Sequence, residues 1–357
     1  MRASPPNDAP SHSFFQELPL SNTSLHPIAR RLYTALVLPL RDDLGIDEPG
    51  LRRLVRYYLQ QPRFAAEGGL IANPEAGEAF YLTREEKRRV LEIVMEEAAG
   101  RMPVLAGTFA WTTAETVQTA LDAKALGAQG IFVVPPAGSM DVAIAWDSVR
   151  YPEVWLDQIK AQDEAVDLPI FTHPITNASQ PWGLGLPLEP TLKFCREVPN
   201  IVGWKTTYAY QGHRILARAM RDQAPGVALL CSSAHFFHEY LASGNFDGTI
   251  SGSWNYALEP MLDHIEAMRA NDLVAARRIW DAGLARLHEY IYAEPGRLHV
   301  RYKIATWLRG LIESPRMRPP MPEPRVEEIR RIDQLLRGAG IEVVREQTRM
   351  DAAGRQA

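Results

Sequence analysis

The distribution of apolar positions along the chain predicts a repeating strand–helix architecture. From residue 32 onward, short apolar runs typical of buried parallel strands alternate with segments in which apolar residues recur every three to four positions, as on one face of a helix. The predicted strands are 32–40, 69–73, 103–108, 130–135, 169–173, 201–206, 227–232 and 248–252. Eight strands alternating with helices indicate an α/β protein with a (β/α)8 TIM barrel.

The pattern changes after residue 255, where strand-like runs stop and three or four helical segments follow. We therefore expect a TIM barrel with a C-terminal helical extension. The predicted organisation is a polar N-terminal arm (1–30), the barrel (31–255), C-terminal helices (256–340) and a disordered tail (341–357). A doubly wound sheet shows the same alternation, but no Gly-rich GxGxxG turn follows the first strand.

Composition and charge narrow the functional class. The 357 residues carry a formal net charge of -4, which argues against a nucleic-acid-binding surface. The two cysteines, Cys195 and Cys231, form no CxxC pair, so neither a disulfide framework nor a cysteine-based metal site is predicted. No run of 18 apolar residues is present, and residues 1–30 lack the apolar core of a signal peptide. We expect a cytoplasmic protein with no membrane span.

The pattern of apolar and polar positions singles out Lys205 as a candidate catalytic residue. It ends the apolar run 201–205, which is predicted to be a buried strand. Burial disfavours the charged ammonium and lowers its pKa, and a neutral amine is a nucleophile for carbonyl carbon. A structural lysine paired with a carboxylate is the alternative interpretation. The other lysines lie in amphipathic helical patterns, where a solvated lysine is ordinary: 87, 124, 160, 193 and 303.

Other polar residues fall near the C-terminal ends of predicted strands, where TIM barrels carry their active sites. His173 follows strand five and could act as an acid or base near neutral pH, or could be an ordinary loop histidine. Glu75 follows strand two and could transfer protons, pair with a cationic substrate group, or face solvent. Ser233 and His235 follow strand seven and could contact the distal part of a substrate.

Several motifs in their order along the chain carry a family resemblance. They are Thr34-Ala35-Leu36-Val37-x-Pro39, Gly77-Glu78, and the segments 103–108, 201–206 and 248–252. With them the chain resembles the dihydrodipicolinate synthase / N-acetylneuraminate lyase family of Schiff-base (class I) aldolases and dehydratases, over about residues 31–340. The resemblance implies a TIM barrel, a Schiff-base lysine at Lys205, no metal or organic cofactor, and a homo-oligomer.

The chain departs from this family's pattern at two places. The family's GTTG loop, which holds the substrate carboxylate, reads Pro74-Glu75-Ala76-Gly77 here. A carboxylate at Glu75 would repel a substrate carboxylate unless it is protonated or turned away. The family's strand-five tyrosine, a proton relay, aligns with Phe171, which has no proton to transfer. Arg150 could replace the lost carboxylate contacts or be a surface arginine.

These observations predict a Schiff-base lyase, an aldolase or dehydratase, that acts on a small carbonyl compound. A 2-oxo acid is one candidate substrate, but dihydrodipicolinate synthesis is not predicted. Lys205, His173 and Glu75 are the predicted catalytic residues. The predicted substrate contacts are Phe171, Ala76, Gly77, Thr206, Ser233, His235 and Gly252.

Two alternatives of other classes remain open at this point. One is a non-catalytic binding or regulatory homologue that has kept the barrel and lost turnover. The other is a metal-dependent barrel enzyme using His173 and His235. His235 and His238 are three residues apart and would share a helix face, but a zinc site needs a third protein ligand and the sequence offers no obvious one.

Overall fold

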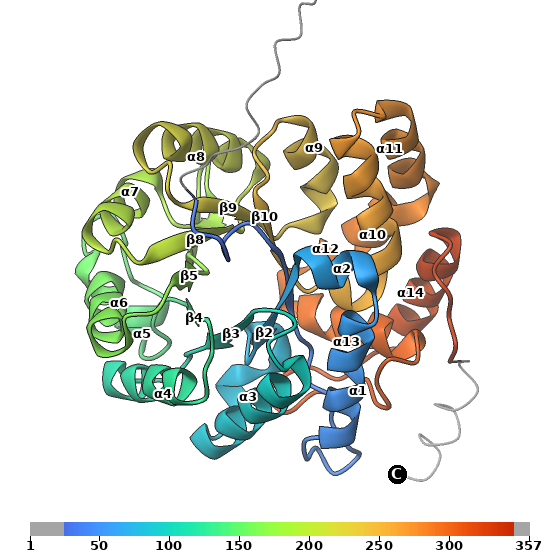
Figure 1. Cartoon of the computed structure of the whole chain (residues 1–357), viewed down its shortest axis with the longest axis horizontal. Coiled ribbons are helices and arrows are strands. Elements are labelled where there is room, and N and C mark those ends of the chain that lie inside the picture. Colours follow the sequence, from blue (N-terminus) through green and yellow to red (C-terminus); the bar gives the residue numbers. More distant parts are fainter. Residues whose placement is uncertain (1–24, 346–357) are drawn as a thin grey trace, which may run out of the picture.

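A closed barrel of parallel strands forms the centre of the computed structural model, which describes residues 25–345 (Figure 1). Around the barrel the strands follow the order β1-β10-β9-β8-β5-β4-β3-β2. Each overlaps one of the predicted runs, so the TIM-barrel prediction is confirmed. The strands are β1 (Leu32–Ala35), β2 (Gly68–Ala72), β3 (Val104–Gly107), β4 (Gly130–Val133), β5 (Ile170–Thr172), β8 (Ile201–Thr206), β9 (Ala228–Cys231) and β10 (Gly248–Ser251).

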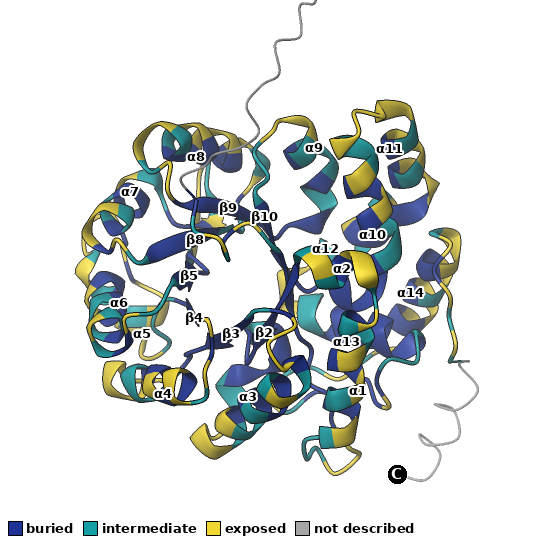
Figure 2. Ribbon diagram, viewed as in Figure 1, coloured by how far each residue is buried: buried dark blue, intermediate teal, exposed yellow. Residues whose placement is uncertain are grey.

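Helices surround the barrel with their apolar faces inward and their polar faces in solvent (Figure 2). Two of them begin with a capping box, in which a threonine and the glutamate three residues later satisfy free backbone N–H groups. The surrounding helices are α1 (Glu48–Leu59), α2 (Pro62–Glu67), α3 (Arg84–Ala98), α4 (Thr113–Ala125), α5 (Met140–Ala143), α6 (Glu153–Val166), α7 (Leu188–Glu197), α8 (Tyr210–Gln223) and α9 (Phe237–Ala242).

The predicted C-terminal helical extension is present and lies on one side of the barrel (orange to red in Figure 1). Its helices are α10 (Trp254–Arg269), α11 (Leu273–Ile279), α12 (Ala285–Tyr292), α13 (Leu298–Leu308) and α14 (Val326–Gly338). Helix α13 is buried along most of its length, so it packs as part of the core and is not an appendage. Within residues 25–345, no helix is long and apolar enough to cross a membrane.

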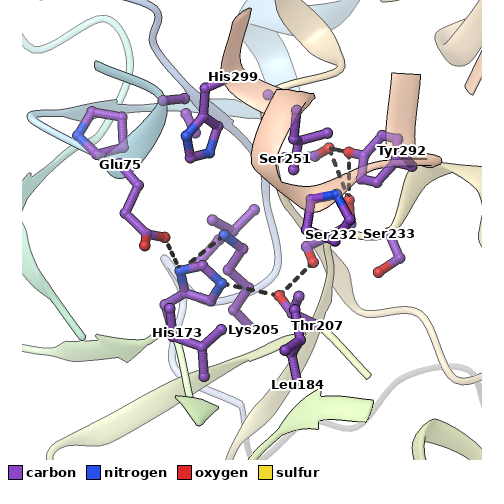
Figure 3. A pocket seen from close by; sticks show the side chains of 18 of the residues that line it. Glu75, His173, Leu184, Lys205, Thr207, Ser232, Ser233, Ser251, Tyr292 and His299 are labelled. Atoms are coloured by element: carbon purple, nitrogen blue, oxygen red, sulfur yellow. Dashed lines mark hydrogen bonds and ion pairs between the residues drawn. The ribbon is translucent and has the colours of Figure 1, made fainter. Parts of the chain in front are cut away.

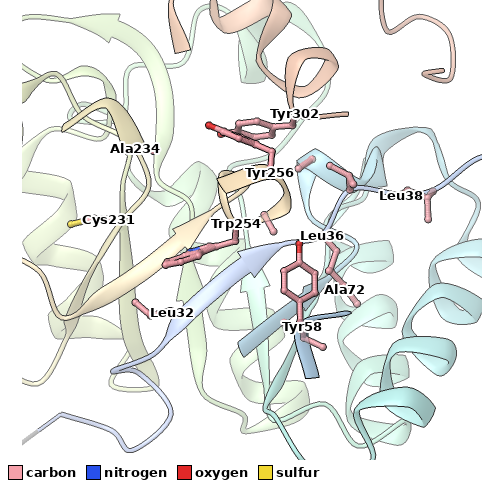
Figure 4. Packing of buried hydrophobic residues seen from close by; sticks show 14 of the residues in the cluster. Leu32, Leu36, Leu38, Tyr58, Ala72, Cys231, Ala234, Trp254, Tyr256 and Tyr302 are labelled. Carbon is pink, nitrogen blue, oxygen red and sulfur yellow. The ribbon is translucent and has the colours of Figure 1, made fainter. Parts of the chain in front are cut away.

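Strand alternation divides the core into two layers. One layer fills the barrel itself and includes Tyr33, Phe132 and Phe171. The other lies between the strands and the helices and includes Trp204, which is fully buried there as its alternation with Lys205 predicts. Figure 4 shows part of this outer layer, where Tyr58, Trp254 and Tyr256 pack beside β1.

The described ends of the chain are more ordered than the sequence predicts. Ala29 in the expected polar arm is fully buried, and Tyr33 Oη donates to the Ile28 carbonyl at 2.8 Å, so this segment packs against the interior layer of the barrel. In the expected disordered tail, Ile341 is buried and Val344 N donates to the Leu308 carbonyl at 2.9 Å. The rest of both predictions, at 1–24 and 346–357, lies outside the described residues.

A two-stranded hairpin is inserted between β5 and α7, where the sequence predicted no strands. Strands β6 (Ile175–Ser179) and β7 (Gly183–Gly185) pair antiparallel. Gly183 has a φ of +65°, a conformation that glycine adopts without the steric strain of a Cβ. Asn177 Nδ2 donates to the carbonyl of Ile144, which links the hairpin to the segment after β4.

Candidate active site

A cavity of about 480 Å³ opens at the C-terminal ends of the barrel strands. Its walls come from the loop after β2, the ends of β5, β8, β9 and β10, the β6–β7 hairpin, and helices α12 and α13. This is the position at which (β/α)8 barrels assemble active sites from several loops.

Lys205 enters the cavity from β8. Its Nζ lies 3.3 Å from His173 Nδ1 and 5.7 Å from the centre of the Phe132 ring. Burial lowers the pKa of Lys205 to about 8, although the negative charge of Glu75 opposes the shift. A much larger share of this amine is therefore neutral near pH 7 than of a solvated lysine, and a neutral amine can attack a carbonyl carbon.

His173 is held between a carboxylate and a hydroxyl (Figure 3). Its Nδ1 donates a hydrogen bond to Glu75 Oε2, and its Nε2 lies 3.1 Å from Thr207 Oγ1. Burial acts to raise the pKa of Glu75, but the charge and hydrogen bond of His173, together with Lys205, outweigh it and lower the pKa to about 2. Glu75 is thus an ionised carboxylate at neutral pH.

The ionised Glu75 determines the tautomer of the neutral His173 ring. A carboxylate only accepts hydrogen bonds, so Nδ1 carries the hydrogen and Nε2 accepts from the Thr207 hydroxyl. Burial lowers the pKa of His173, and Lys205 adds to that effect while Glu75 opposes it. Thr207 Oγ1 in turn accepts from Ser232 Oγ at 2.8 Å, and Ser232 Oγ also lies 3.3 Å from the Thr206 carbonyl.

Four of the residues predicted to contact substrate line the cavity: Ala76, Ser233, His235 and Gly252. Ala76 belongs to the loop after β2, and Ser233 and His235 follow β9. Gly252 packs against the Tyr302 ring so closely that an added Cβ would lie 2.2 Å from a ring carbon. A side chain at position 252 would therefore push Tyr302 out of place.

Three other predicted contacts lie outside the cavity lining. Phe171 sits deeper in the barrel, edge-on to the Tyr33 ring at 5.3 Å between ring centres. Thr206 alternates with Lys205 and faces the helix layer, with its hydroxyl 3.5 Å from the Leu230 carbonyl. Gly77 backs onto the Leu36 carbonyl.

The strand register explains the misplacement of Phe171. Strand β5 pairs with β8 so that Phe171 lies beside Gly203 and Thr172 beside Trp204. The next position up, His173, is therefore the one that lies beside Lys205. Phe171 and His173 share a face of the strand, so alternation alone does not distinguish the level of the lysine from the layer beneath it.

The expectation that every lysine outside the predicted strands is solvated is wrong for Lys87 and Lys303. Lys303 in α13 is fully buried, and its Nζ lies 2.5 Å from Glu78 Oε1. Lys87 in α3 is buried and donates to the Phe109 carbonyl at 2.5 Å. The apolar residues around Lys303 were a signal that α13 is a core helix, because a helix that is hydrophobic all round is buried.

The sequence interpretation did not include the residues that the C-terminal extension contributes. Tyr292, His299 and Tyr302 line the cavity, and Figure 3 shows His299 projecting from its helix toward the space that holds Glu75 and His173. Tyr302 Oη lies 2.6 Å from Tyr292 Oη, which donates to the Ser232 carbonyl at 2.8 Å. Only the packing of α12 and α13 beside the barrel mouth brings them there.

The metal-dependent alternative gains no support from the side chains. Among residues 25–345, no group of three or more His, Cys, Asp or Glu residues is placed to hold a metal ion. His235 instead packs on the rings of Phe236 and Tyr292, with centres 3.9 and 5.1 Å away.

Comparisons with known proteins agree with the barrel fold. The model of the dihydrodipicolinate synthetase family matches residues 29–137. A 4-hydroxy-tetrahydrodipicolinate synthase of Methylococcus capsulatus is 31% identical over 281 residues, which cover 78% of this chain and 88% of that protein.

Solved structures are similar over nearly their whole length. A dihydrodipicolinate synthase from Aquifex aeolicus has a TM-score of 0.74 at 23% identity, covering 88% of this chain and 99% of that one. A chloride-inhibited dihydrodipicolinate synthase from Acinetobacter baumannii, complexed with pyruvate, has a TM-score of 0.73 at 25% identity, covering 88% of this chain and all of that one. With identity above 30% to the Methylococcus protein over most of its length, the chain belongs to the dihydrodipicolinate synthetase family.

Proposed function

We propose that this protein is a class I lyase that forms a Schiff base between Lys205 and a small carbonyl compound. The observation that carries the proposal is the position of the Lys205 amine in the cavity, where burial lowers its pKa to about 8. The His173 imidazole lies 3.3 Å from this amine. The imine that results is an electron sink, so a neighbouring C–C or C–O bond can break, or form in the reverse direction.

The first step is attack of neutral Lys205 Nζ on the carbonyl carbon. The C–N bond forms, the carbonyl π electrons move to oxygen, and the oxygen takes up a proton. The amine then loses a proton, and the hydroxyl group takes up a second proton and departs as water, which leaves the protonated imine. Each of these transfers needs a group near Nζ that gives or accepts a proton. His173 lies there, and because its Nδ1–H donates to Glu75, the ring accepts a proton at Nε2, by way of the Thr207 hydroxyl.

His173 is the proposed acid and base, and Glu75 orients it. An ionised Glu75 cannot donate a proton near pH 7, so the predicted proton transfer by Glu75 itself is replaced by a positioning role. The Glu75 carboxylate contacts one nitrogen of the His173 ring and the Thr207 hydroxyl contacts the other. In such an arrangement the carboxylate stabilises the imidazolium that forms when the ring accepts a proton. Thr207 Oγ1 lines the cavity and can pass that proton to or from substrate oxygen.

Borohydride trapping tests the proposal directly. Reduction in the presence of an accepted carbonyl compound should add a stable mass at Lys205. Substituting His173 with Ala should slow turnover by about 10²- to 10⁴-fold while Lys205 remains trappable. Phe171→Leu, one layer deeper, is the matched control and should keep the relay intact. Near wild-type rates in His173→Ala would place the relay elsewhere.

We also propose that the reaction differs from that of the 4-hydroxy-tetrahydrodipicolinate synthases to which the chain is similar. Position 173, beside the lysine, holds an imidazole, and the loop after β2 offers Pro74, Glu75 and Ala76 in place of hydroxyl side chains. Incubation with pyruvate and aspartate semialdehyde should give no product above background. Condensation with a kcat of about 1 s⁻¹ or more would contradict this part of the proposal.

A homo-oligomer remains a proposal that rests on the family resemblance. A dihydrodipicolinate synthase variant described as monomeric has the same fold, with a TM-score of 0.73 at 20% identity, so the fold does not decide the assembly. Light scattering coupled to size-exclusion chromatography should give a mass of at least twice the 40.0 kDa chain. A mass equal to one chain would refute the expectation.

A further inference from the structure

The chemistry of the cavity lining identifies a class of substrate. We propose that the carbonyl substrate is an uncharged aldehyde or ketone that carries a bulky apolar group and no carboxylate next to the carbonyl. This inference rests on the Schiff-base function proposed above, and it departs from the 2-oxo acid that the family resemblance offers as a candidate.

The cavity lining that the structure describes carries one lysine and one acidic side chain. Of the described residues that line the cavity, Lys205 is the only lysine or arginine and Glu75 the only acidic residue. Once the lysine is a protonated imine, its single positive charge is balanced by ionised Glu75. The imidazoles of His235 and His299 add no charge, because burial lowers the pKa of each to about 4. A substrate carboxylate would leave this half-buried site with an uncompensated negative charge, which is costly.

The negative charge of Glu75 lies close to the nitrogen that would form the imine. Only His173 Nδ1 separates the Glu75 carboxylate from Lys205 Nζ. In an imine of a 2-oxo acid, the carboxylate is attached to the carbon that is bonded to Nζ. It would therefore share the buried space of Glu75, where like charges repel strongly.

The side chains of the lining offer little to hold such a carboxylate. Pro74, Glu75 and Ala76 bring no side-chain donor, and the Thr207 and Ser232 hydroxyls already bond within the chain that leads to His173. Arg150, a candidate from the sequence, is exposed, lies outside the lining, and packs over the Tyr151 ring at 5.3 Å.

The wall away from Lys205 is apolar. Ile175 and Leu184 come from the β6–β7 hairpin, Phe236 follows β9, and Leu298 opens α13. Leu184 is 40% exposed although it lines the cavity, so its apolar surface is free to be covered by a ligand. A cavity of about 480 Å³ exceeds the needs of a three-carbon acid and suits a substrate with a ring or branched chain.

A matched pair of carbonyl compounds tests the charge argument in the wild-type protein. Pyruvate and methyl pyruvate differ by one negative charge, and n-butylamine in solution corrects for their different intrinsic reactivity. After this correction, borohydride trapping at Lys205 should favour the ester by about tenfold or more. Equal trapping, or trapping that favours pyruvate, would overturn the proposal. Lys205→Ala measures the background from other amines.

Two variants locate the effect. Glu75→Gln removes the charge with little change in shape and should shift the ester-to-pyruvate ratio toward pyruvate by about tenfold. An unchanged ratio would show that Glu75 does not exclude the carboxylate. Leu184→Ala should reduce trapping of 4-phenylbutan-2-one severalfold more than trapping of acetone. Equal losses for both ketones would show that Leu184 does not bind the apolar group of the substrate.

A reactivity probe separates this inference from the function on which it rests. The uncharged diketone 2,4-pentanedione condenses with reactive lysines to a chromophoric enaminone. If it fails to label Lys205 and no carbonyl compound is trapped there, the Schiff-base function itself is wrong. If it labels Lys205 but pyruvate is the preferred substrate, only the substrate class is wrong.

Discussion

Two interior lysines, the half-buried Lys205 and the fully buried Lys303, lie near the same loop and have different surroundings. Lys303 Nζ lies 2.5 Å from Glu78 Oε1, and both side chains are fully buried. Lys205 Nζ instead contacts an imidazole, and the nearby carboxylate, Glu75, is bound by that imidazole. Burial lowers the pKa of both amines, but at Lys303 the bonded Glu78 opposes the effect directly.

The difference shows that the partner, more than burial, decides the role of an interior lysine. An ammonium that donates to a carboxylate has no free lone pair and no adjoining space for a carbonyl carbon. Glu78 also accepts from the backbone N of Arg318 at 2.6 Å, so the Lys303 pair ties α13 and the segment before α14 to the loop after β2. Lys205 lines a cavity that a ligand can enter, whereas Lys303 fills the contact between α13 and the loop after β2.

Replacing Lys205 should have the largest effect on activity. In Lys205→Met, we expect turnover to fall by about 10⁴-fold or more, as when the nucleophile of other covalent enzymes is removed. The borohydride adduct should disappear, while circular dichroism and the melting temperature should report an intact fold. Undiminished turnover in Lys205→Met would end the Schiff-base mechanism, because none of the other lysines lies in a strand.

Replacing Lys303 should act on stability. Lys303→Met leaves Glu78 buried without its partner, so we expect a loss of about 3–5 kcal/mol in the free energy of unfolding. The double variant Glu78→Gln, Lys303→Met removes both charges and should recover part of that loss. Urea unfolding of the wild type, both single variants and the double variant measures the coupling. A single variant as stable as the wild type would mean that the pair contributes nothing.

Lys205 should titrate well below a solvated lysine. Labelling of Lys205 by 2,4-pentanedione should rise with pH and reach half its maximum near pH 8, well below the pH at which a solvated lysine titrates. Because the unfolded state holds the Lys205 proton more tightly, it binds more protons between about pH 8 and 10.5. Stability relative to Lys205→Met should therefore increase with pH across that window.

In Glu75→Gln the labelling midpoint should move to lower pH, since the Glu75 charge raises the pKa of Lys205. A midpoint near 10 in the wild type would show that the amine is not desolvated, and would remove the electrostatic basis for the difference between the two lysines. Intact-mass analysis across a pH series measures both midpoints.

The smallest predicted effect lies in the hydroxyl chain beside His173. Thr207→Val removes one hydrogen bond to the imidazole and should lower kcat about 3- to 10-fold with little change in KM. Thr206→Val is the matched control, since its hydroxyl faces the helix layer. If both variants lose activity equally, the effect comes from packing of β8 and the proton path does not run through Thr207.

The local sequence pattern determined the barrel and the place of Lys205 in it. Apolar runs and helical periods identified the strands, and alternation predicted that Trp204 packs outward while Lys205 points inward. These properties depend on neighbours one to four positions apart, so the sequence carries them. The loop residues Glu75 and Ala76 followed from the rule that barrel sites lie at the C-terminal ends of strands.

Only the tertiary structure decided which side chains meet. The register between β5 and β8 places His173, and not Phe171, beside Lys205. The packing of α13 beside the barrel mouth brings His299 into the cavity and buries Lys303 against Glu78, about 225 residues away in sequence. The two-residue period of a strand predicts which face a side chain occupies but not its height along the barrel axis. The period of a helix predicts its apolar side but not the element that packs against it. Long-range packing supplies both, which is why the place of Lys205 in the barrel was predictable from the sequence and its surroundings were not.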